Sequence, residues 1–279
     1  MKFGFIGAGK VGFSLGKYLS DNGQDVTGYY SEFSEDAVEA AEFTKSKSYD
    51  NIELLVKDSD VLFLTVSDGQ IENVWEQLKI CHISHKIVCH CSGALSSEVF
   101  SNIAEFGSFG YSIHPLFAVS NKYQSYKELS NSYFTIEGSP EKIGEIKALF
   151  ESFGNNVCVV SKEDKVKYHS AAAIASNLVA GLIGISEGLL KECGFDEESA
   201  HKALAPIIQG NIKHIIDDGV TQALTGPVER NDVGTVKKHL AVLEKNDKEA
   251  YITVSRRLVE IAKTKNRDRD YSEMEEILK

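Results

Sequence analysis

Short apolar runs alternate with amphipathic segments through the first half of the chain. Between two of these runs, Val11, Leu15 and Leu19 repeat every four residues, which is the spacing of one helix face. Alternation of this kind predicts parallel βαβ units, and therefore an α/β fold with a doubly wound, mostly parallel sheet. The predicted strands are residues 2–7, 25–31, 61–66, 86–90, 110–114 and 133–137, with residues 156–160 as a strand at the edge.

The pattern changes after Ser161, where long helical segments replace the alternation. The helical segments are predicted at about residues 165–193, 196–217, 232–246 and 247–264. The first is rich in Ala, Gly and Ser, which is typical of a closely packed central helix. We therefore expect two domains, residues 1–162 and an all-α domain over residues 163–279. The charged tail from Lys265 is expected to be loosely attached.

Charge and cysteine content narrow the class of protein. With 30 Lys and Arg against 41 Asp and Glu, the formal net charge of −11 argues against a nucleic-acid or anionic-membrane partner. The 5 cysteines are irregularly spaced, so no disulfide framework follows. The N-terminus lacks a secretory pattern. The most apolar stretch, residues 171–185, is shorter than the roughly 20 residues of a bilayer span. We expect a cytoplasmic protein.

A glycine motif follows the first predicted strand and opens the first predicted helix. In such a turn the first glycine, Gly7, permits the tight bend, and the second, Gly9, lets a pyrophosphate approach the backbone. The third, Gly12, lets helix and strand pack closely, while the helix N-terminus offers free N–H groups and a positive dipole. The motif predicts a Rossmann sheet that binds a dinucleotide through Gly7, Ala8, Gly9, Lys10, Val11 and Gly12.

The residues after the second predicted strand bear on the choice of dinucleotide. An acidic residue there binds the adenosine ribose and favours NAD, whereas an arginine favours NADP. The chain has Ser31, which can bond a hydroxyl or a phosphate, followed by Glu32. These residues leave NAD and NADP open as the cofactor. Further cofactor contacts are predicted where later strands end, at Thr65, Val66, Ser67 and Ser92.

Three polar residues are candidates for catalysis. His114 closes a predicted strand, and Pro115 holds it in an extended conformation on the ligand side of the sheet. Because histidine titrates near neutral pH, His114 is the candidate acid or base. His169 and Asn177 share one face of the first long helix and are predicted to orient the substrate. The alternative for these two residues is a satisfied hydrogen-bond network in the interior.

Residues 224–232 join two predicted helices. Thr225 and Arg230 are candidate substrate-binding residues, because a guanidinium binds a carboxylate or phosphate with two hydrogen bonds. Asp232 is a candidate cap of the next helix. The alternative for the segment is a plain helix–helix turn. Cys89 and Cys91 face the same side of a predicted strand without a second ligand pair, so we interpret them as core thiols and predict no metal site.

The order of motifs resembles a known family. The motifs are GAGKVG, VLFLTVSD, HCSGALSSEVF, SIHPLF, KYHSAAAIASN and QALTGPVERNDVGTVKKHL. They are similar to those of Rossmann-like oxidoreductases that carry a C-terminal helical domain of unknown function, number 2520. This family is related to 6-phosphogluconate dehydrogenase-like and pyrroline-5-carboxylate reductase-like enzymes. The resemblance implies a homodimer through the helical domain and a substrate that binds between the domains.

The resemblance also bears on the cofactor and the catalytic residues. It slightly favours NADP as the cofactor. Family members, however, often carry an arginine where this chain has Glu32. Related β-hydroxyacid dehydrogenases use a lysine early on the first long helix and an asparagine one turn later. The chain has His169 followed by alanines in that region, so this mechanism is not carried over. His114 with Pro115 is similar to the substrate-facing His-Pro of prephenate dehydrogenases.

We therefore expect an NAD(P)-dependent oxidoreductase that transfers a hydride between nicotinamide and a small carbonyl, imine or hydroxy metabolite. One alternative is a sensor that binds a dinucleotide without turnover, because a Rossmann fold does not by itself establish catalysis. A further alternative is a prephenate-like dehydrogenase. Metabolite-dependent oxidation or reduction of the nicotinamide distinguishes the enzyme from the sensor.

Overall fold

The computed structural model describes residues 1–279 and divides into two compact units, Met1–Ala175 and Ser176–Lys279. Helix α6 (Lys165–Ala175) belongs to the first unit, because the side chain of Lys165 is buried there. The compact units therefore part later in the chain than the sequence-predicted boundary at residues 162–163. That boundary stays a prediction about the domains.

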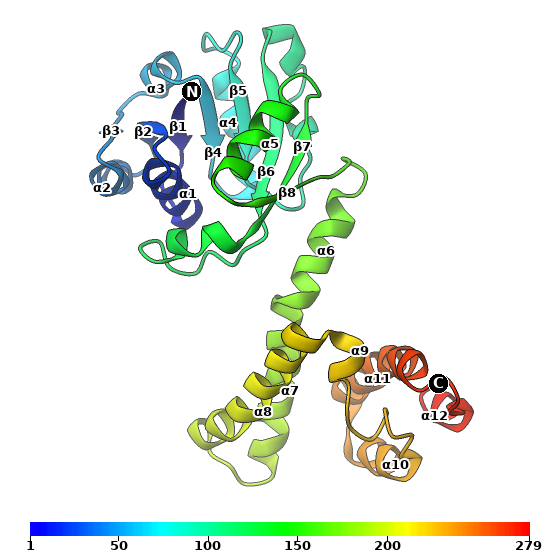
Figure 1. The fold of residues 1–279 in the computed structure, drawn as a ribbon. Helices are drawn as coiled ribbons and strands as arrows, with labels where there is room; N and C mark the ends of the chain where they lie inside the picture. Colours follow the sequence, from blue (N-terminus) through cyan, green and yellow to red (C-terminus); the bar gives the residue numbers. More distant parts are fainter. The chain divides into compact units, whose positions relative to one another are not determined.

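The first unit is built on one eight-stranded sheet in the order β3-β2-β1-β4-β5-β6-β7-β8 (Figure 1). Every neighbouring pair is parallel except β6 and β7, which run antiparallel. This confirms the predicted α/β fold. The strands are β1 (Lys2–Ile6), β2 (Asp25–Tyr30), β3 (Lys47–Ser48), β4 (Val61–Leu64), β5 (Ile87–His90), β6 (Phe109–Pro115), β7 (Tyr133–Gly138) and β8 (Asn156–Val159). The sequence did not predict β3, because two residues are too few to show a hydrophobic period.

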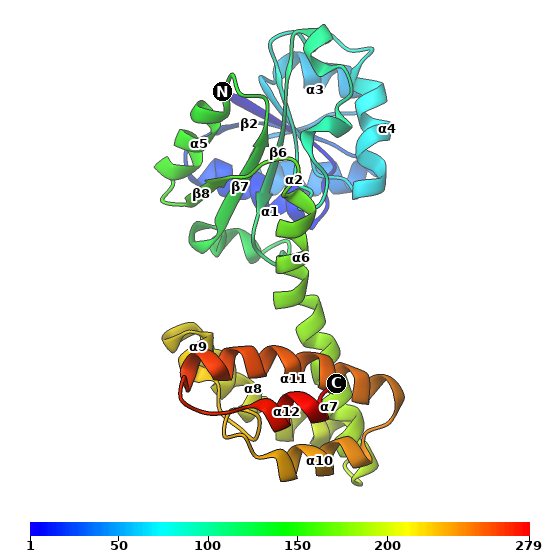
Figure 2. The ribbon, with the colours of Figure 1, turned by 90° about the vertical axis from the view of Figure 1, so that its right-hand side faces the viewer.

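Helices cover both faces of this sheet, as Figure 2 shows for α5 on one side and for α3 and α4 on the other. Along β4, Phe63 faces the core under α1 and α2, whereas Leu62 and Leu64 face the core under α3 and α4. Burial on both faces explains the continuous apolar runs of the sequence. The helices are α1 (Lys10–Asp21), α2 (Ser34–Thr44), α3 (Ile52–Asp58), α4 (Asp68–Leu78) and α5 (Ile143–Ser152), with 3-10 turns η1 (Ser97–Val99), η2 (Ile103–Phe106), η3 (Ser125–Lys127) and η4 (Leu129–Asn131).

The prediction of one continuous helix over about residues 165–193 is wrong in one respect, because the structure interrupts the helix at Ser176. Ser176 has φ −123° and ψ −77°, outside the helical region, and it separates α6 from α7 (Asn177–Glu192). The Ser176 hydroxyl donates to the Asn177 side chain at 3.2 Å. Local bonds of this kind compete with helix formation. His169 therefore lies on α6 and Asn177 on α7.

The second unit contains only helices, as predicted. They are α7, α8 (Glu197–Asp218), α9 (Val220–Ala223), α10 (Val233–Val242), α11 (Lys245–Lys265) and α12 (Ser272–Ile277). The tail is not loosely attached: Tyr271, Met274 and Leu278 are buried in the core with Val236 of α10 and Val259 of α11. These three apolar side chains recur at helical spacing, so they pack although the surrounding residues are charged.

Apolar side chains remain exposed on α6, α7 and α8. Exposure reaches 57% for Leu178, 60% for Ile207 and 76% for Ile216. By length and composition alone, the segment Lys165–Glu192 is also long and apolar enough to cross a membrane. This corrects the expectation that no stretch is long enough, which considered too short a segment. A single such helix is weak evidence of a membrane span. Core helices of soluble proteins meet the same criterion, although those are mostly buried and the apolar part of this segment is not.

Candidate active site

The glycine turn between β1 and α1 has the geometry that its sequence predicted. Gly7 has φ +100°, which an L side chain rarely adopts. A Cβ on Gly12 would lie 2.3 Å from Thr65 Oγ1, so only glycine permits this packing. A Cβ on Gly9, in contrast, would meet no heavy atom within 4 Å. The backbone at Gly9 is therefore open to a ligand.

The start of α1 is suited to an anion. It has no side-chain cap and no acidic residue in its first turn. Its first backbone hydrogen bond runs from the Phe13 N–H to the Gly9 carbonyl at 2.9 Å, and the N–H groups before Phe13 have no acceptor within the helix. These N–H groups and the helix dipole together favour a phosphate at this place.

A pocket of 590 Å³ lies beside the turn, within the size range of small-molecule sites. The Thr65 hydroxyl donates to the Gly7 carbonyl at 2.7 Å and so ties the turn to the end of β4. The pocket is lined by Ile6, Gly7, Ala8, Gly9, Tyr30, Ser31, Glu32, Phe33, Thr65, Val66, Ser67, Gln70, Val74 and Gln77. The structure thus brings the predicted residues Ser31, Thr65, Val66 and Ser67 to the glycine turn. An open backbone, free N–H groups and an adjoining pocket fit a dinucleotide.

A second polar cluster lies where β5 and β6 meet α6. The buried Lys165 ammonium donates to Ser112 Oγ at 2.6 Å and to the Ser92 carbonyl at 3.0 Å. His114 Nδ1 and the Tyr168 hydroxyl share a hydrogen bond of 2.7 Å. Consecutive turns of α6 therefore contact neighbouring positions of β6.

Gly93 lies between two imidazole rings. A Cβ at this position would lie 2.7 Å from His169 Nδ1 and 3.0 Å from His114 Nε2. The two ring centroids are 6.5 Å apart. The structure thus brings together the predicted residues His114 and His169, and only a residue without a side chain fits between them.

Burial sets the protonation of this cluster. Burial, reinforced by the charge of Lys165, lowers the pKa of His114 to about 4, so the imidazole is neutral at pH 7. Burial also lowers the pKa of Lys165 to about 8, although the Glu137 carboxylate opposes the shift. Lys165 therefore titrates closer to neutral pH than His114 does.

The loop after β5 is held by His90 and Asp68. His90 Nδ1 accepts from the Ser92 N–H at 3.1 Å, and its Nε2 lies 3.2 Å from the Ser96 carbonyl, so these partners assign the proton to Nε2. The Ser92 hydroxyl donates to Asp68 Oδ2 at 2.7 Å and accepts from the Leu95 N–H at 3.0 Å. Ser92, predicted as a cofactor contact, thus has its hydroxyl engaged within the protein.

Sequence reasoning missed Lys165 and the role of His90. One signal for Lys165 was available: it precedes Tyr168 and His169 by three and four residues, which places all three on one helix face. A cation in the first turn of a helix is also disfavoured by the dipole, so its presence there needs another reason. No local pattern distinguished His90 from the neighbouring core residues.

The remaining predicted residues, Asn177, Thr225 and Arg230, lie in the second unit and are exposed. Asn177 begins α7, and the other two belong to the loop before α10. Asp232 caps α10, since its Oδ1 accepts from the Thr235 N–H at 3.0 Å. That cap confirms the predicted start of the helix.

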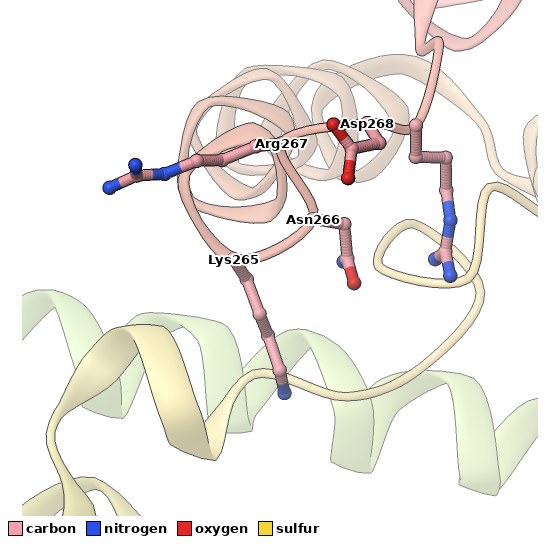
Figure 3. A pocket seen from close by; sticks show the side chains of 5 residues that line it. Lys265, Asn266, Arg267 and Asp268 are labelled. Carbon is pink, nitrogen blue, oxygen red and sulfur yellow. The ribbon is translucent and has the colours of Figure 1, made fainter.

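A hollow of 670 Å³ around residues 265–269 borders the same loop (Figure 3). Lys265 donates to the Leu224 carbonyl at 2.7 Å, and Arg269 donates to the Glu229 carbonyl at 2.6 Å. Arg267 points away from the other side chains in Figure 3. Lys265 and Arg269 therefore hold the loop in place. We interpret the hollow as a by-product of this structural contact and not as a ligand site.

The fold and the glycine turn define a Rossmann-like protein, and residues 1–115 match the Rossmann-like domain family. Residues 132–258 match DUF2520, a domain of unknown function. Two family models thus match successive parts of the chain, the Rossmann-like domain first and DUF2520 second, in the order that its motifs implied. The second match begins before β7, so it includes the last strands of the sheet as well as helices. Among curated proteins, none matches the chain.

Solved structures share this architecture along nearly the whole chain. A protein of Thermotoga maritima is 26% identical over 95% of this chain and 99% of its own, with a TM-score of 0.78. A Bacteroides fragilis protein, described provisionally as an NADP oxidoreductase, is 20% identical over 93% and 98%, with a TM-score of 0.70. A pyrroline-5-carboxylate reductase of Coxiella burnetii is 17% identical over 94% and 97%, with a TM-score of 0.61. These likenesses establish the fold.

Proposed function

We propose that the chain is an NAD(P)-dependent oxidoreductase acting on a small carbonyl, imine or hydroxy compound. The observation that carries the proposal is the pocket beside the glycine turn, where Gly9 is open and the start of α1 is uncapped. A nicotinamide dinucleotide supplies or accepts the hydride when it is bound. The similarity to a reductase and to a protein described provisionally as an NADP oxidoreductase supports the same class of reaction.

Within the first unit, we assign dinucleotide binding to the glycine turn and proton transfer to His114. The turn and the N–H groups of α1 would hold the pyrophosphate, and Thr65 keeps the turn in place. His114 is the proposed acid or base: its neutral ring accepts a proton from a hydroxy substrate, while the bond to Tyr168 fixes its orientation. Lys165 is protonated below a pH of about 8 and places a positive charge beside the cluster.

The proposed substrate contacts are the exposed polar residues His169, Asn177, Thr225 and Arg230. His169 is exposed, and its ring centroid lies 6.5 Å from that of His114, so a substrate at His114 would be close to it. Arg230 is suited to a substrate that carries a carboxylate or a phosphate. The proposal thus favours a small anionic metabolite over a neutral one.

The experiment that tests the function has two stages. Calorimetric titration with NADH and NADPH measures binding to the pocket, and the absorbance of the reduced nicotinamide then reports turnover with a panel of metabolites. We expect binding and at least one metabolite-dependent change in absorbance. Binding without turnover across carbonyl, imine and hydroxy compounds would favour the sensor instead.

We also propose that the exposed apolar side chains of α7 and α8 pack against a second copy of the chain. On α8 the exposed Ile207, Ile212 and Ile216 share the helix with the charged Lys213 and Asp217. A bilayer interior disfavours such charges, whereas a protein interface accepts them at its rim. The motifs resemble those of a family that forms homodimers, which favours a second copy of the chain as the partner that covers these apolar side chains.

A further inference from the structure

One wall of the dinucleotide pocket is formed by the segment between β2 and α2. Tyr30, Ser31, Glu32 and Phe33 all line the pocket, and Phe33 is 60% exposed. In a Rossmann sheet the residues after the second strand lie at the adenosine ribose, while the pyrophosphate lies at the start of the first helix. An exposed aromatic ring at this place offers a flat apolar surface to a base. The segment is therefore the adenosine end of the pocket.

The charge of this end is negative. Among all residues that line the pocket, Glu32 is the only one with a formal charge, and no lysine or arginine is present. The first turn of α2 adds Glu35 and Asp36. These two carboxylates already complement the positive end of the α2 dipole, which would otherwise attract a phosphate.

The nearest lysines in sequence are placed elsewhere. Lys45 and Lys47 line a separate hollow together with Lys2, Asp25 and other residues around β3, and not the dinucleotide pocket. Lys10 begins α1, next to the expected position of the pyrophosphate. No cation of the pocket wall is thus left to neutralise an additional phosphate on the ribose.

We infer that Glu32 makes the pocket select NAD over NADP. The inference rests on the proposed dinucleotide site and specifies its cofactor. The 2′- and 3′-hydroxyls of NAD can donate hydrogen bonds to the Glu32 carboxylate, which accepts at both oxygens. A 2′-phosphate removes one of these donors and brings about two negative charges next to a carboxylate. On this inference the chain departs from the family resemblance, which slightly favours NADP, because Glu32 stands where the family often carries an arginine.

The size of the preference follows from the hydrogen bonds involved. Hydrogen bonds to a charged group change an equilibrium by about 10- to 100-fold when one partner is removed. We therefore expect the full-length protein to bind NADH at least about 10-fold more tightly than NADPH. Glu32→Gln should bring the two affinities closer together, and Glu32→Arg should reverse the preference.

Calorimetric titration with NADH and NADPH measures these affinities without requiring a substrate. Glu42→Arg is the matched control, because it makes the same change of charge on an exposed residue of α2 that does not line the pocket. The control should leave the ratio of the two affinities unchanged. A thermal unfolding curve confirms that each variant is folded.

The outcomes separate the inference from the proposed function. Equal or tighter binding of NADPH by the natural sequence overturns the selection of NAD and leaves the oxidoreductase proposal standing. A preference for NADH that persists in a folded Glu32→Arg variant removes Glu32 as its cause. Absence of binding by either dinucleotide overturns both proposals together.

Discussion

Gly9→Val is the substitution that tests the dinucleotide site most directly. Gly9 has φ −70° and ψ −175°, an extended conformation that valine adopts readily. A Cβ there meets no heavy atom within 4 Å, so the variant should fold. The new side chain would instead occupy the space in which a pyrophosphate approaches the backbone.

The expected loss of affinity can be worked from the hydrogen bonds at the start of α1. A hydrogen bond between an N–H group and a charged phosphate contributes about 1.5–3 kcal/mol. Displacing the pyrophosphate from two such groups costs about 3 kcal/mol or more, and each 1.4 kcal/mol is about tenfold in Kd. Gly9→Val should therefore weaken dinucleotide binding by about 10²-fold or more.

Calorimetry with NADH and NADPH measures the affinity, and thermal unfolding measures the stability. Gly144→Val on α5 is the control, because a Cβ there also meets no neighbour and the position is far along the chain from the turn. Gly12→Val should behave differently and destabilise the fold, since its Cβ would overlap Thr65. A folded Gly9→Val protein with unchanged affinity would refute the assignment of the pocket.

Three further predictions follow from the cluster around His114 and from the exposed helices. His114→Asn should keep the fold and dinucleotide binding but lower kcat by about 10²-fold or more in steady-state assays; preserved turnover per folded molecule would make His114 structural. Burial lowers the pKa of His90 from 6.5 to about 4 in the folded chain, so the unfolded chain binds more protons between these values. The free energy of unfolding, measured in urea, should therefore fall as the pH drops from about 6.5 toward 4, and His90→Gln should reduce that dependence. A steep fall retained in His90→Gln would point to other groups. Light scattering at micromolar concentration should give twice the mass of the chain, and a monomer would contradict the proposed pairing through α7 and α8.

Sequence patterns predicted the sheet well because both of its faces are buried. Runs such as Val61–Leu64 are apolar at every position, and they are recognisable without knowledge of their neighbours. The roles of Gly7, Gly9 and Gly12 were also predictable, because a tight turn, an open backbone and close packing each require glycine within a few residues. At these positions the local sequence pattern and the tertiary structure require the same type of residue.

The polar cluster was less predictable because its partners are distant in sequence. The buried Lys165 ammonium donates to the Ser112 hydroxyl and to the Ser92 carbonyl. A lysine in the first turn of a helix hints at a special role, but the local sequence does not show which distant groups bind it. The break at Ser176 was missed for a related reason. A serine within an apolar run can remain helical or bond to a neighbour, and the local hydrophobic period does not decide between these.

The place where α6 ends has a practical consequence for dissecting the chain. The hydrogen bonds of Lys165 and Tyr168 all lie within Met1–Ala175, so a cut after Ala175 leaves every one of them intact. A cut at residue 162 would remove both side chains and leave the Ser112 hydroxyl and the Ser92 carbonyl without the Lys165 ammonium. A fragment that ends at Ala175 therefore keeps the surroundings of His114 and allows them to be studied without the second unit.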